Sequence, residues 1–323
     1  MLHILYKSIG IVAFMVSLSL GLISCTPEPE SKVLKVGSNQ WMGYEPLFLA
    51  REKGQYDPSM VKLVELQSST DTLRLLRAGM IDAGMLTLDE VLSEVALGTE
   101  LEVVMVVDAS AGADVLLVKP SLKSLADIKG KRVGVENGAV GATLLNGALL
   151  EAGLDVSDIV VVPLKLNQHL SAYMQGEVDV LVTFEPISSQ LLKQGAVKLF
   201  DSRKIPNQII DVLAVRKSVV SDAESSIKRL IDGYFFALDF LKKHPAEAVQ
   251  LMAPRLGISS AEMLAGYEGI SLAGKDGNKR LFSGQPKEIV EVTNKLQVIL
   301  LRANLLTQKI DAEKLFNAQF VVP

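Results

Sequence analysis

The chain has 323 residues, of which 49% are hydrophobic and 22% are charged, and its formal net charge is −4. This length accommodates two domains or one large α/β domain, and the composition is globular rather than disordered. Nucleic-acid binding needs a basic stripe that this charge balance does not provide, so no nucleic-acid partner is expected.

Residues 1–24 are predicted to be an export signal. His3 and Lys7 form a weakly positive start, and residues 9–23 are an almost uncharged apolar run. That run is short for a membrane-spanning helix, which needs about 20 apolar residues. The segment LISC, which ends at Cys25, resembles a bacterial lipobox, in which the cysteine is lipidated and becomes the first mature residue. Lipidation at Cys25 is therefore predicted, against the alternative of an incidental cysteine after a simple cleaved signal.

A polar, proline-rich tether is predicted over residues 25–31. Since Cys25 is the only cysteine, the mature chain cannot form an internal disulfide. No Cys/His cluster has metal-ligand spacing, and no cofactor is predicted. The isolated His169 and His244 are expected to lie in the core or in solvent.

Strand and helix patterns alternate through the first part of the mature chain. Strands are predicted over residues 32–39, 61–66, 81–86 and 101–109, and helices over 47–54, 70–78 and 88–97. Asp71 lies in the first turn of the second helix, and Gly79 marks its end. This alternation predicts an α/β fold with a mostly parallel sheet and helices on both faces.

The alternation restarts after Gly112. Strands are predicted over residues 114–119, 131–136, 159–164, 178–184 and 211–216, and helices over 139–153, 166–175, 222–243, 245–255, 259–267 and 286–305. Residues 79–82 and 176–179 both end a helix and open a strand, and an acid follows each strand. This weak echo favours two similar lobes. Ligands of open α/β sheets bind beyond the carboxyl ends of the strands, so facing loops are expected to form the site.

Six segments then occur in an order that resembles a known family: residues 39–54, 69–92, 103–118, 125–145, 176–186 and 199–217. The most specific are W-x-G-Y-E-P at 41–46 and D-x-K-G-K-x-V-G-V at 127–135. They resemble the ABC transporter substrate-binding proteins of the nitrate/sulfonate/taurine type, which include binders of thiamine precursors. The resemblance covers nearly all of the mature chain.

This resemblance implies a type II periplasmic-binding fold, in which two α/β lobes are joined by two crossing strands and close on a ligand. The crossings would lie near residues 107–113 and 202–212. Lobe one would then be residues 32–110 with 212–323, and lobe two residues 111–211.

An aromatic loop opens the candidate binding site. Trp41 is the only tryptophan, and it lies near Tyr44 and Glu45 with Gly43 between. Aromatic rings stack on flat or cationic ligands with about 0.5–2 kcal/mol each, and glycine lets the backbone approach a ligand closely. This pattern favours ligand binding over a tryptophan packed into the base of the loop.

Polar residues at strand ends and crossings complete the candidate site: Thr87, Asp89, Ser110, Asp114, Glu185 and Asp211. Asp89 and Glu185 open helices, so capping is an equal alternative for them. Asn137 and Gly138 precede a helix whose free N–H groups suit an anionic or carbonyl group, although tight-turn packing explains them equally well. Arg203 and Lys204 are expected to be a solvated charge pair.

The export signal and the lipobox-like segment predict a lipid-anchored protein on the outer side of a bacterial membrane, and the family resemblance implies that it delivers a small molecule to an ABC permease. A sensory module for a membrane kinase or chemoreceptor is an alternative that the sequence does not separate from it. An enzyme on the same fold, in thiamine-pyrimidine or menaquinone synthesis, is disfavoured because the chain has an export signal and no cysteine-rich segment.

The candidate acids outnumber the candidate bases. Asp108 adds to the acids at the strand ends. The only basic residues expected near the presumed cleft are Arg203 and Lys204. A buried anion without partners is costly. The sequence therefore predicts a cationic, zwitterionic or amino-heterocyclic ligand rather than a simple oxyanion.

Overall fold

The structure is a computed structural model that describes residues 32–136 and 140–322. The predicted export signal, the tether with Cys25, and the pair Asn137 and Gly138 lie outside the described residues. Within the described part, no helix is both long and apolar enough to cross a membrane.

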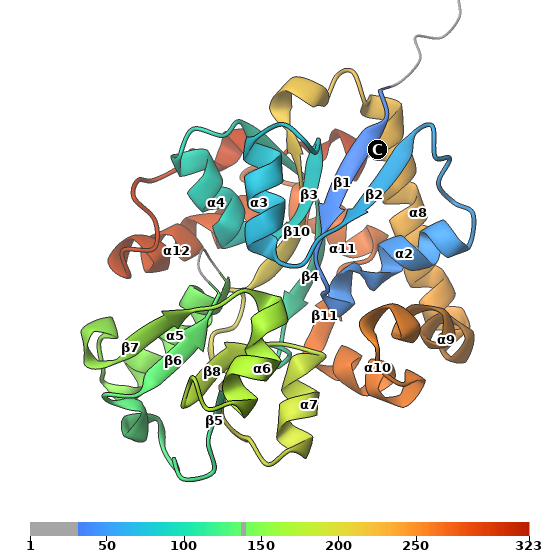
Figure 1. The fold of residues 1–323 in the computed structure, drawn as a ribbon. Helices are drawn as coiled ribbons and strands as arrows, with labels where there is room; N and C mark the ends of the chain where they lie inside the picture. The colour runs from blue at the N-terminus through green and yellow to red at the C-terminus, as the bar shows by residue number, and fades with distance from the viewer. Residues whose placement is uncertain (1–31, 137–139, 323) are drawn as a thin grey trace, which may run out of the picture. The chain divides into compact units, whose positions relative to one another are not determined.

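The described strands form two sheets, which Figure 1 shows with their helices. The first sheet has the order β11 (Ile270–Leu272), β4 (Leu101–Ser110), β10 (Ile210–Arg216), β3 (Ala83–Thr87), β1 (Leu34–Ser38) and β2 (Val61–Glu65). The second has the order β7 (Val160–Pro163), β6 (Arg132–Val135), β8 (Val180–Thr183), β5 (Val115–Val118) and β9 (Val197–Asp201).

The prediction of mostly parallel strands is wrong. β1 is parallel to β2 and β3, and β6 is parallel to β7 and β8. However, β10 is antiparallel to β3 and β4, β11 to β4, and β5 to β8 and β9. The chain leaves the first sheet along β4 and returns along β10, so these neighbours must run in opposite directions. Both sheets are therefore mixed.

The two passages between the sheets lie side by side. One joins β4 to β5 through residues 111–114, and the other joins β9 to β10 through residues 202–209. The backbone N–H of Ser110 donates to the carbonyl of Ile209 at 3.1 Å, and that of Ser202 donates to the carbonyl of Asp114 at 3.0 Å. These hydrogen bonds hold the two passages together.

Helices cover both faces of each sheet (Figure 1). Those associated with the first sheet are α2 (Glu45–Glu52), α3 (Ser69–Arg77), α4 (Leu88–Ala96), α8 (Glu224–Lys243), α9 (Pro245–Leu256), α10 (Ser260–Gly266), α11 (Lys275–Phe282) and α12 (Glu288–Arg302). Those associated with the second are α5 (Val140–Ala152), α6 (His169–Met174) and α7 (Ile187–Lys193).

Side-chain alternation along β5 divides the second core in two. Leu116 and Val118 belong to the cluster that contains the α5 side chains, whereas Val115 and Leu117 belong to the cluster of α6 and α7. Period-two alternation in a strand sends neighbouring side chains to opposite faces. Apolar residues at every position of β5 therefore fit a strand that is covered on both sides.

The predicted start and end of α3 are confirmed. Ser68 caps the helix, since its side chain accepts from the N–H of Asp71, which lies in the first turn. Gly79 just beyond the helix has φ +69°, a conformation that costs glycine little and other residues more.

Besides short 3-10 turns, the described residues include two α-helices and two strands that the sequence analysis did not predict: α7 and α11, β9 and β11. A polar side chain fixes α11. Asn278 accepts from the N–H of Val106 and donates to its carbonyl, both at 2.8 Å. The Asn278 amide thus bonds to the backbone of β4 as a neighbouring strand would. Such a contact between distant residues is not visible in the periodicity of the sequence.

Candidate ligand-binding site

A pocket is lined by segments from both sheets. Its described lining residues are Asn39, Trp41, Tyr44, Ser69, Thr87, Glu90, Asp114, Val140, Phe184, Ile209 and Asp211. Asn39 follows β1, Thr87 ends β3, and Phe184 follows β8. Three of these described residues carry a carboxyl group: Asp114 between β4 and β5, Asp211 near the start of β10, and Glu90 on α4. None of the described lining residues is Lys, Arg or His.

The structure brings five of the predicted site residues into this lining: Trp41, Tyr44, Thr87, Asp114 and Asp211. It adds the polar residues Asn39, Ser69 and Glu90 and the apolar residues Val140, Phe184 and Ile209, which sequence reasoning missed. Asn39 directly follows a strand, and Glu90 accepts from the N–H of Thr87 at 2.9 Å as the third residue of α4. The Thr-x-x-Glu spacing that caps this helix was the available signal for Glu90.

Trp41 both packs and lines the pocket. It is only 4% exposed, and its indole N–H donates to Oδ2 of Asp108 at 3.1 Å. Its ring meets that of Phe184 edge to face, with centroids 5.3 Å apart. The two alternatives drawn from the sequence therefore describe parts of one arrangement, in which Trp41 joins the base of the loop to the pocket wall.

The structure gives a different reason for glycine at position 43 from the one predicted. It is not among the described lining residues. A Cβ at this position would lie 1.9 Å from Oδ2 of Asp108 and 2.4 Å from Nε1 of Trp41. The glycine is needed because the backbone passes close to the Trp41–Asp108 hydrogen bond, not because it approaches a ligand.

Three aspartates gather around the floor of the pocket. Asp108 on β4 lies opposite Asp211 on β10, and the Tyr44 hydroxyl donates to Oδ1 of Asp211. The N–H of Asp114 donates to Oγ of Ser110 at 3.2 Å. Ser110 thus supports the Asp114 segment from outside the lining. Oδ1 of Asp108 and Oδ2 of Asp114 are buried without a hydrogen-bond partner among the described groups.

Burial makes the carboxyl groups of the pocket weak acids. Burial, followed by the negative charges of Asp108 and Asp89, raises the pKa of Asp114 to about 7, against a hydrogen bond with Ser110 that lowers it. Burial raises the pKa of Glu90 to about 8, again with help from Asp89. Removing a carboxylate from water disfavours its charged form, and like charges add to the effect. A cation in the pocket would offset both causes.

Glu45 does not line the pocket. Its carboxylate is buried and accepts from Nε of Arg255 at 2.9 Å through both oxygens. The Arg255 guanidinium lies 3.5 Å from the centroid of the Phe48 ring. Burial still raises the pKa of Glu45, and Arg255 opposes that shift. The acid that the sequence assigned to the ligand thus belongs to an internal ion pair.

Asp89 and Glu185 also lie outside the described lining. Asp89 is buried in the first turn of α4, and Thr143 on α5 donates to its Oδ2 at 2.6 Å. Glu185 accepts from Oγ of Ser189 at 2.9 Å, within the turn that opens α7. Both acids lie at the starts of helices, but the hydrogen bond of Asp89 joins it to α5, and the capping box of α4 is formed by Thr87 and Glu90. The structure does not describe Asn137 or Gly138.

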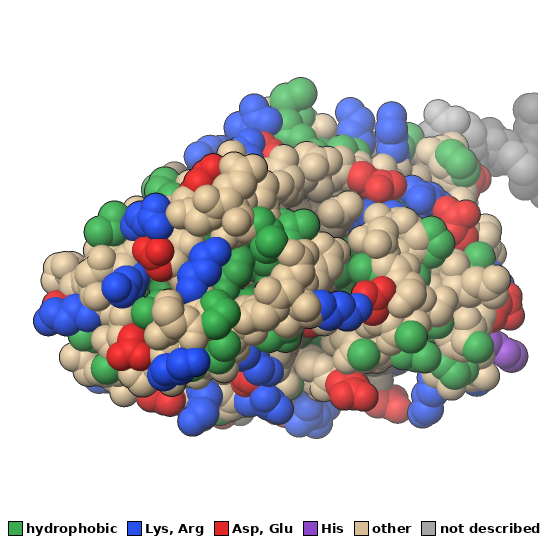
Figure 2. Space-filling view, turned by 60° about the horizontal axis from the view of Figure 1, so that its bottom comes forward, with side chains coloured by type: hydrophobic (Ala, Val, Ile, Leu, Met, Phe, Trp, Pro, Cys, Tyr) green, Lys and Arg blue, Asp and Glu red, His purple; other side chains and the backbone are tan. Residues whose placement is uncertain are grey.

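Arg203 and Lys204 each form an ion pair with a separate acidic residue. Arg203 donates from Nε to Oδ1 of Asp201 at 3.0 Å, and Lys204 lies 3.5 Å from Glu151. Both basic side chains are largely exposed. Figure 2 shows basic and acidic side chains mixed over one face of the molecule. On that face, negative charge does not dominate as it does in the pocket lining.

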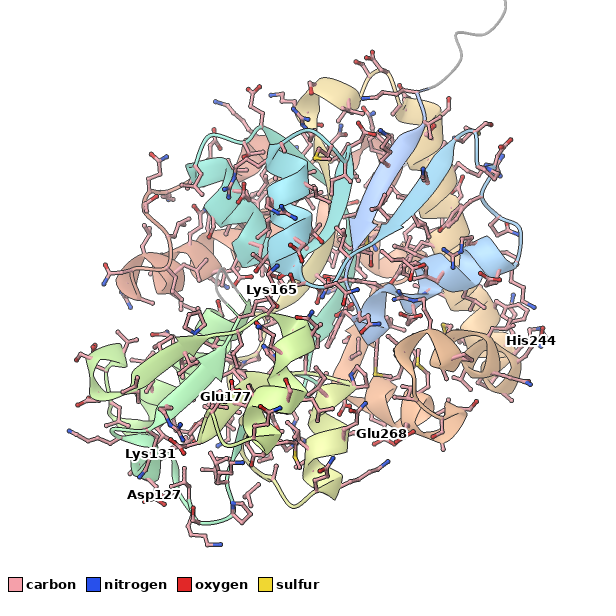
Figure 3. The ribbon with its side chains drawn as sticks, viewed as in Figure 1. Asp127, Lys131, Lys165, Glu177, His244 and Glu268 are labelled. Carbon is pink, nitrogen blue, oxygen red and sulfur yellow. The ribbon has the colours of Figure 1, made fainter. Side chains whose placement is uncertain are left out.

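Several polar contacts join the segment 111–211 to the rest of the chain. Thr70 donates to Oε1 of Glu136 from its N–H and its hydroxyl, at 3.1 and 2.8 Å. Lys165, labelled in Figure 3, lies 3.2 Å from Asp71. The Thr143–Asp89 hydrogen bond is a third such contact. They connect the two sides that both contribute to the pocket lining.

No group of three or more His, Cys, Asp or Glu side chains within residues 32–136 and 140–322 is arranged to hold a metal ion. His169, which the sequence left to core or solvent, is buried and pairs through Nδ1 with Thr183 at 3.1 Å. The described pocket lining combines aromatic rings with carboxyl groups.

Comparison with solved structures defines the class of this fold. The alkanesulfonate-binding protein SsuA from Xanthomonas axonopodis pv. citri, bound to MOPS, superposes with a TM-score of 0.77 at 20% identity, covering 90% of this chain and 100% of its own. The periplasmic nitrate-binding protein NrtA from Synechocystis PCC 6803 gives 0.74 at 14% identity, covering 90% and 88%. The fold is that of the periplasmic binding proteins, which confirms the predicted fold class.

The family follows from sequence. A model of the NMT1-like family matches residues 27–256, and the chain belongs to this family. A protein of Escherichia coli (strain K12) that is named for binding aliphatic sulfonates is 26% identical over 256 residues, which cover 77% of this chain and 79% of that protein. A Haemophilus influenzae protein named for thiamine biosynthesis is 27% identical over 247 residues, which cover 74% and 77%. The predicted resemblance is confirmed, and these relatives support a solute-binding role.

Proposed function

We propose that the chain is the solute-binding component of an ABC importer and that it captures a cationic, zwitterionic or amino-heterocyclic small molecule. The observation that carries the ligand class is the pocket lining. It places Asp114, Glu90 and Asp211 beside the rings of Trp41 and Tyr44, with no basic side chain among the described lining residues.

The charge balance of the pocket supports this ligand class. Asp114 is 4% exposed, and its Oδ2 has no partner among the described groups. A ligand N–H that donates to this oxygen would form a charge-assisted hydrogen bond worth about 1.5–3 kcal/mol. An oxyanion at the same place would meet carboxyl groups without a compensating donor from a described base.

The names of the relatives point partly to anions, since they include sulfonate-binding and nitrate-binding proteins. Another relative is a taurine-binding periplasmic protein of Escherichia coli (strain K12), 23% identical over 167 residues. Taurine carries an ammonium as well as a sulfonate. At such identities the lining residues are free to differ, so we infer the ligand class from this chain's own side chains.

We further propose that the protein works outside the cytoplasm, anchored through a lipid on Cys25. Support comes from the apolar run that ends in LISC and from relatives named as periplasmic. Metabolic labelling with a fatty-acid probe should mark the wild type but not Cys25→Ser. Equal labelling of both would show that Cys25 is not the attachment site.

The proposed lobes are residues 32–110 with 212–323 and residues 111–211, and ligand binding is expected to favour their closed arrangement. The support is that the chain passes between the two sheets only through the paired segments 111–114 and 202–209 in the part of the chain that the structure describes. A ligand shifts such an equilibrium by its difference in affinity for the two arrangements.

The proposed ligand class can be tested with a thermal-shift panel of amines, pyrimidines, alkanesulfonates and nitrate. At a ligand concentration about 100 times Kd, binding should stabilise the protein by about 2.7 kcal/mol. We expect stabilisation by members of the amine and pyrimidine groups and its loss in Asp114→Asn. The exposed Asp239→Asn on α8 is the matched control. Stabilisation by nitrate or a sulfonate alone, unchanged in Asp114→Asn, would reject the cationic class.

A further inference from the structure

Two aspartates on neighbouring strands face each other at the floor of the pocket. Asp108 and Asp211 are register partners on β4 and β10, and they are 0% and 3% exposed. Asp211 lines the pocket, whereas Asp108 lies behind it, next to the indole of Trp41. The pair therefore joins Asp211 in the pocket lining to the indole of Trp41, which also lines the pocket.

The hydrogen bonds of this pair leave one oxygen unmatched. Tyr44 donates to Oδ1 of Asp211, and Trp41 donates to Oδ2 of Asp108. Oδ1 of Asp108 receives no donor from the described protein groups. A buried carboxylate oxygen without a donor is costly. A proton held between the two carboxyl groups would supply the missing donor and would remove one of two adjacent negative charges.

The surroundings of the pair add negative charge rather than relieve it. The titratable groups that act on the pair or on its partners are Asp89, Glu90, Asp114, Tyr44, Tyr234 and Tyr267. None of these described groups is basic. Burial raises the pKa of Asp108 to about 7, and burial followed by the charge of Asp108 holds the pKa of Asp211 well above its usual range. Both shifts favour retention of a proton.

We propose that Asp108 and Asp211 share one proton at the floor of the pocket, and that a cationic ligand seated against Asp114 expels it. The O–H bond of the shared carboxyl breaks, the proton passes to the buffer, and the positive charge of the ligand takes its place. The first half stands on the geometry of the pair. The second half rests on the proposed function, and also on Oδ2 of Asp114, which is buried, unpartnered and part of the pocket lining.

The first half can be measured without a ligand, because Trp41 is an intrinsic probe of Asp108. In a Glu90→Gln, Asp114→Asn background, which removes the two other pocket carboxyls that titrate in this range, the Trp41 fluorescence should change in one transition near pH 7 when the purified protein is titrated from about pH 5 to about pH 9. Asp108→Asn should abolish that transition, since an amide does not titrate. The exposed Asp239→Asn should retain it.

Sharing is then distinguished from independent titration by Asp211→Leu. If the protonated Asp211 carboxyl donates to ionised Asp108, it lowers the pKa of Asp108, so loss of that donor should move the Trp41 transition to higher pH. An unmoved transition would overturn the shared proton. Tyr44→Phe is the second variant. It removes a donor that favours ionised Asp211, so the transition should move to higher pH.

The second half is tested with benzylamine, a flat-ringed amine that is charged near neutral pH. Calorimetric titrations in two buffers of different ionisation enthalpy should show release of about half a proton to one proton per bound amine near pH 7. The release should fall in Asp108→Asn. Equal release from the wild type and this variant would place the proton elsewhere and overturn the coupling. If sulfonates bind and benzylamine does not, the proposed ligand class is wrong. The fluorescence titration then still tests whether Asp108 and Asp211 share a proton.

Discussion

The indole N–H of Trp41 and the Oδ2 atom of Asp108 lie 3.1 Å apart, and Gly43 leaves the space in which they meet. A methyl group on Gly43 would occupy that space. We expect Gly43→Ala to break the hydrogen bond and to lower the free energy of unfolding by about 1–3 kcal/mol, the usual cost of overpacking.

Urea denaturation with Trp41 fluorescence as the readout measures both effects. Gly277→Ala is the matched control, because a Cβ at Gly277 in α11 meets nothing within 4 Å. It should be neutral or slightly stabilising, since alanine is the better helix former. Equal stability of the two variants would show that Trp41 and Asp108 make room for a Cβ at position 43 without a loss in the free energy of unfolding.

The Glu45–Arg255 ion pair predicts a large structural effect outside the pocket. Glu45 is fully buried, and the Arg255 side chain is 14% exposed. Arg255→Leu would leave the carboxylate buried without its partner, which costs about 3–5 kcal/mol in comparable cases. Arg51→Leu is the control, because Arg51 forms more exposed ion pairs and should lose at most about 1 kcal/mol. Similar losses in both variants would contradict the internal role of Glu45.

The raised pKa values predict that the ligand-free protein becomes less stable as pH rises from about 6.5 to about 8. Asp114 and Glu90 have pKa values of about 7 and about 8 when folded. Their unfolded values lie near 4, so the folded state binds more protons in this window and stability falls with pH. The expected loss is on the order of 1–3 kcal/mol.

His169 sets the lower limit of that window. Burial lowers its pKa to about 4, so between pH 4 and about 6.5 the unfolded state binds one more proton at this residue, and this contribution rises with pH and opposes the falling contributions of Asp114 and Glu90. Above about 6.5 this contribution is constant. Thermal unfolding of the wild type and Glu90→Gln across the window should show a shallower decline in the variant. A flat wild-type profile would contradict the predicted ionisation of the pocket carboxyls.

The order of most strands and helices follows from the sequence because each has a regular apolar pattern. β5 shows this directly, because it is apolar at every position, whereas the start of α3 is marked by its polar capping residues. The antiparallel pairing of β4 with β10 does not follow, because alternating strands and helices describe local segments and not the direction in which a distant strand returns. The Asn278 contacts that fix α11 are likewise non-local.

The site was predictable in part, for a similar reason. Strand ends, and the crossings that the resemblance implies, identified Thr87, Asp114 and Asp211 as candidates, and the stacking chemistry of an aromatic loop identified Trp41 and Tyr44. Sequence neighbours did not reveal that Glu45 faces Arg255, which is 210 residues away. Asp108 was counted among the nearby acids, but its register with Asp211 needed the sheet.

The contacts across the pocket predict how the closed arrangement is held. Thr143 on α5 donates to Oδ2 of buried Asp89 on α4, whose Oδ1 has no described partner. Thr143→Val would remove the Thr143 donor from Oδ2 as well, so that neither carboxylate oxygen of Asp89 would have a partner from α5. Separation of the proposed lobes would then return both oxygens to water. Small-angle scattering of the ligand-free variant should therefore give a larger radius of gyration than that of the wild type.

Thr293→Val is the matched control for this prediction. Thr293 is also buried, but its hydroxyl bonds to the carbonyl of Ile289 within α12. It should therefore leave the radius unchanged. An unchanged radius in both variants would show that the Thr143–Asp89 contact does not hold the closed arrangement.

The central claim is that buried carboxyl groups make this pocket a site for positive charge. Calorimetry with benzylamine and phenylmethanesulfonate tests it most directly, because the two compounds share a frame and carry opposite charges. At about pH 8, where Asp114 is largely ionised, the amine should bind at least about tenfold more tightly, and Asp114→Asn should reduce that preference. Tighter binding of the sulfonate, unaffected by Asp114→Asn, would contradict the account.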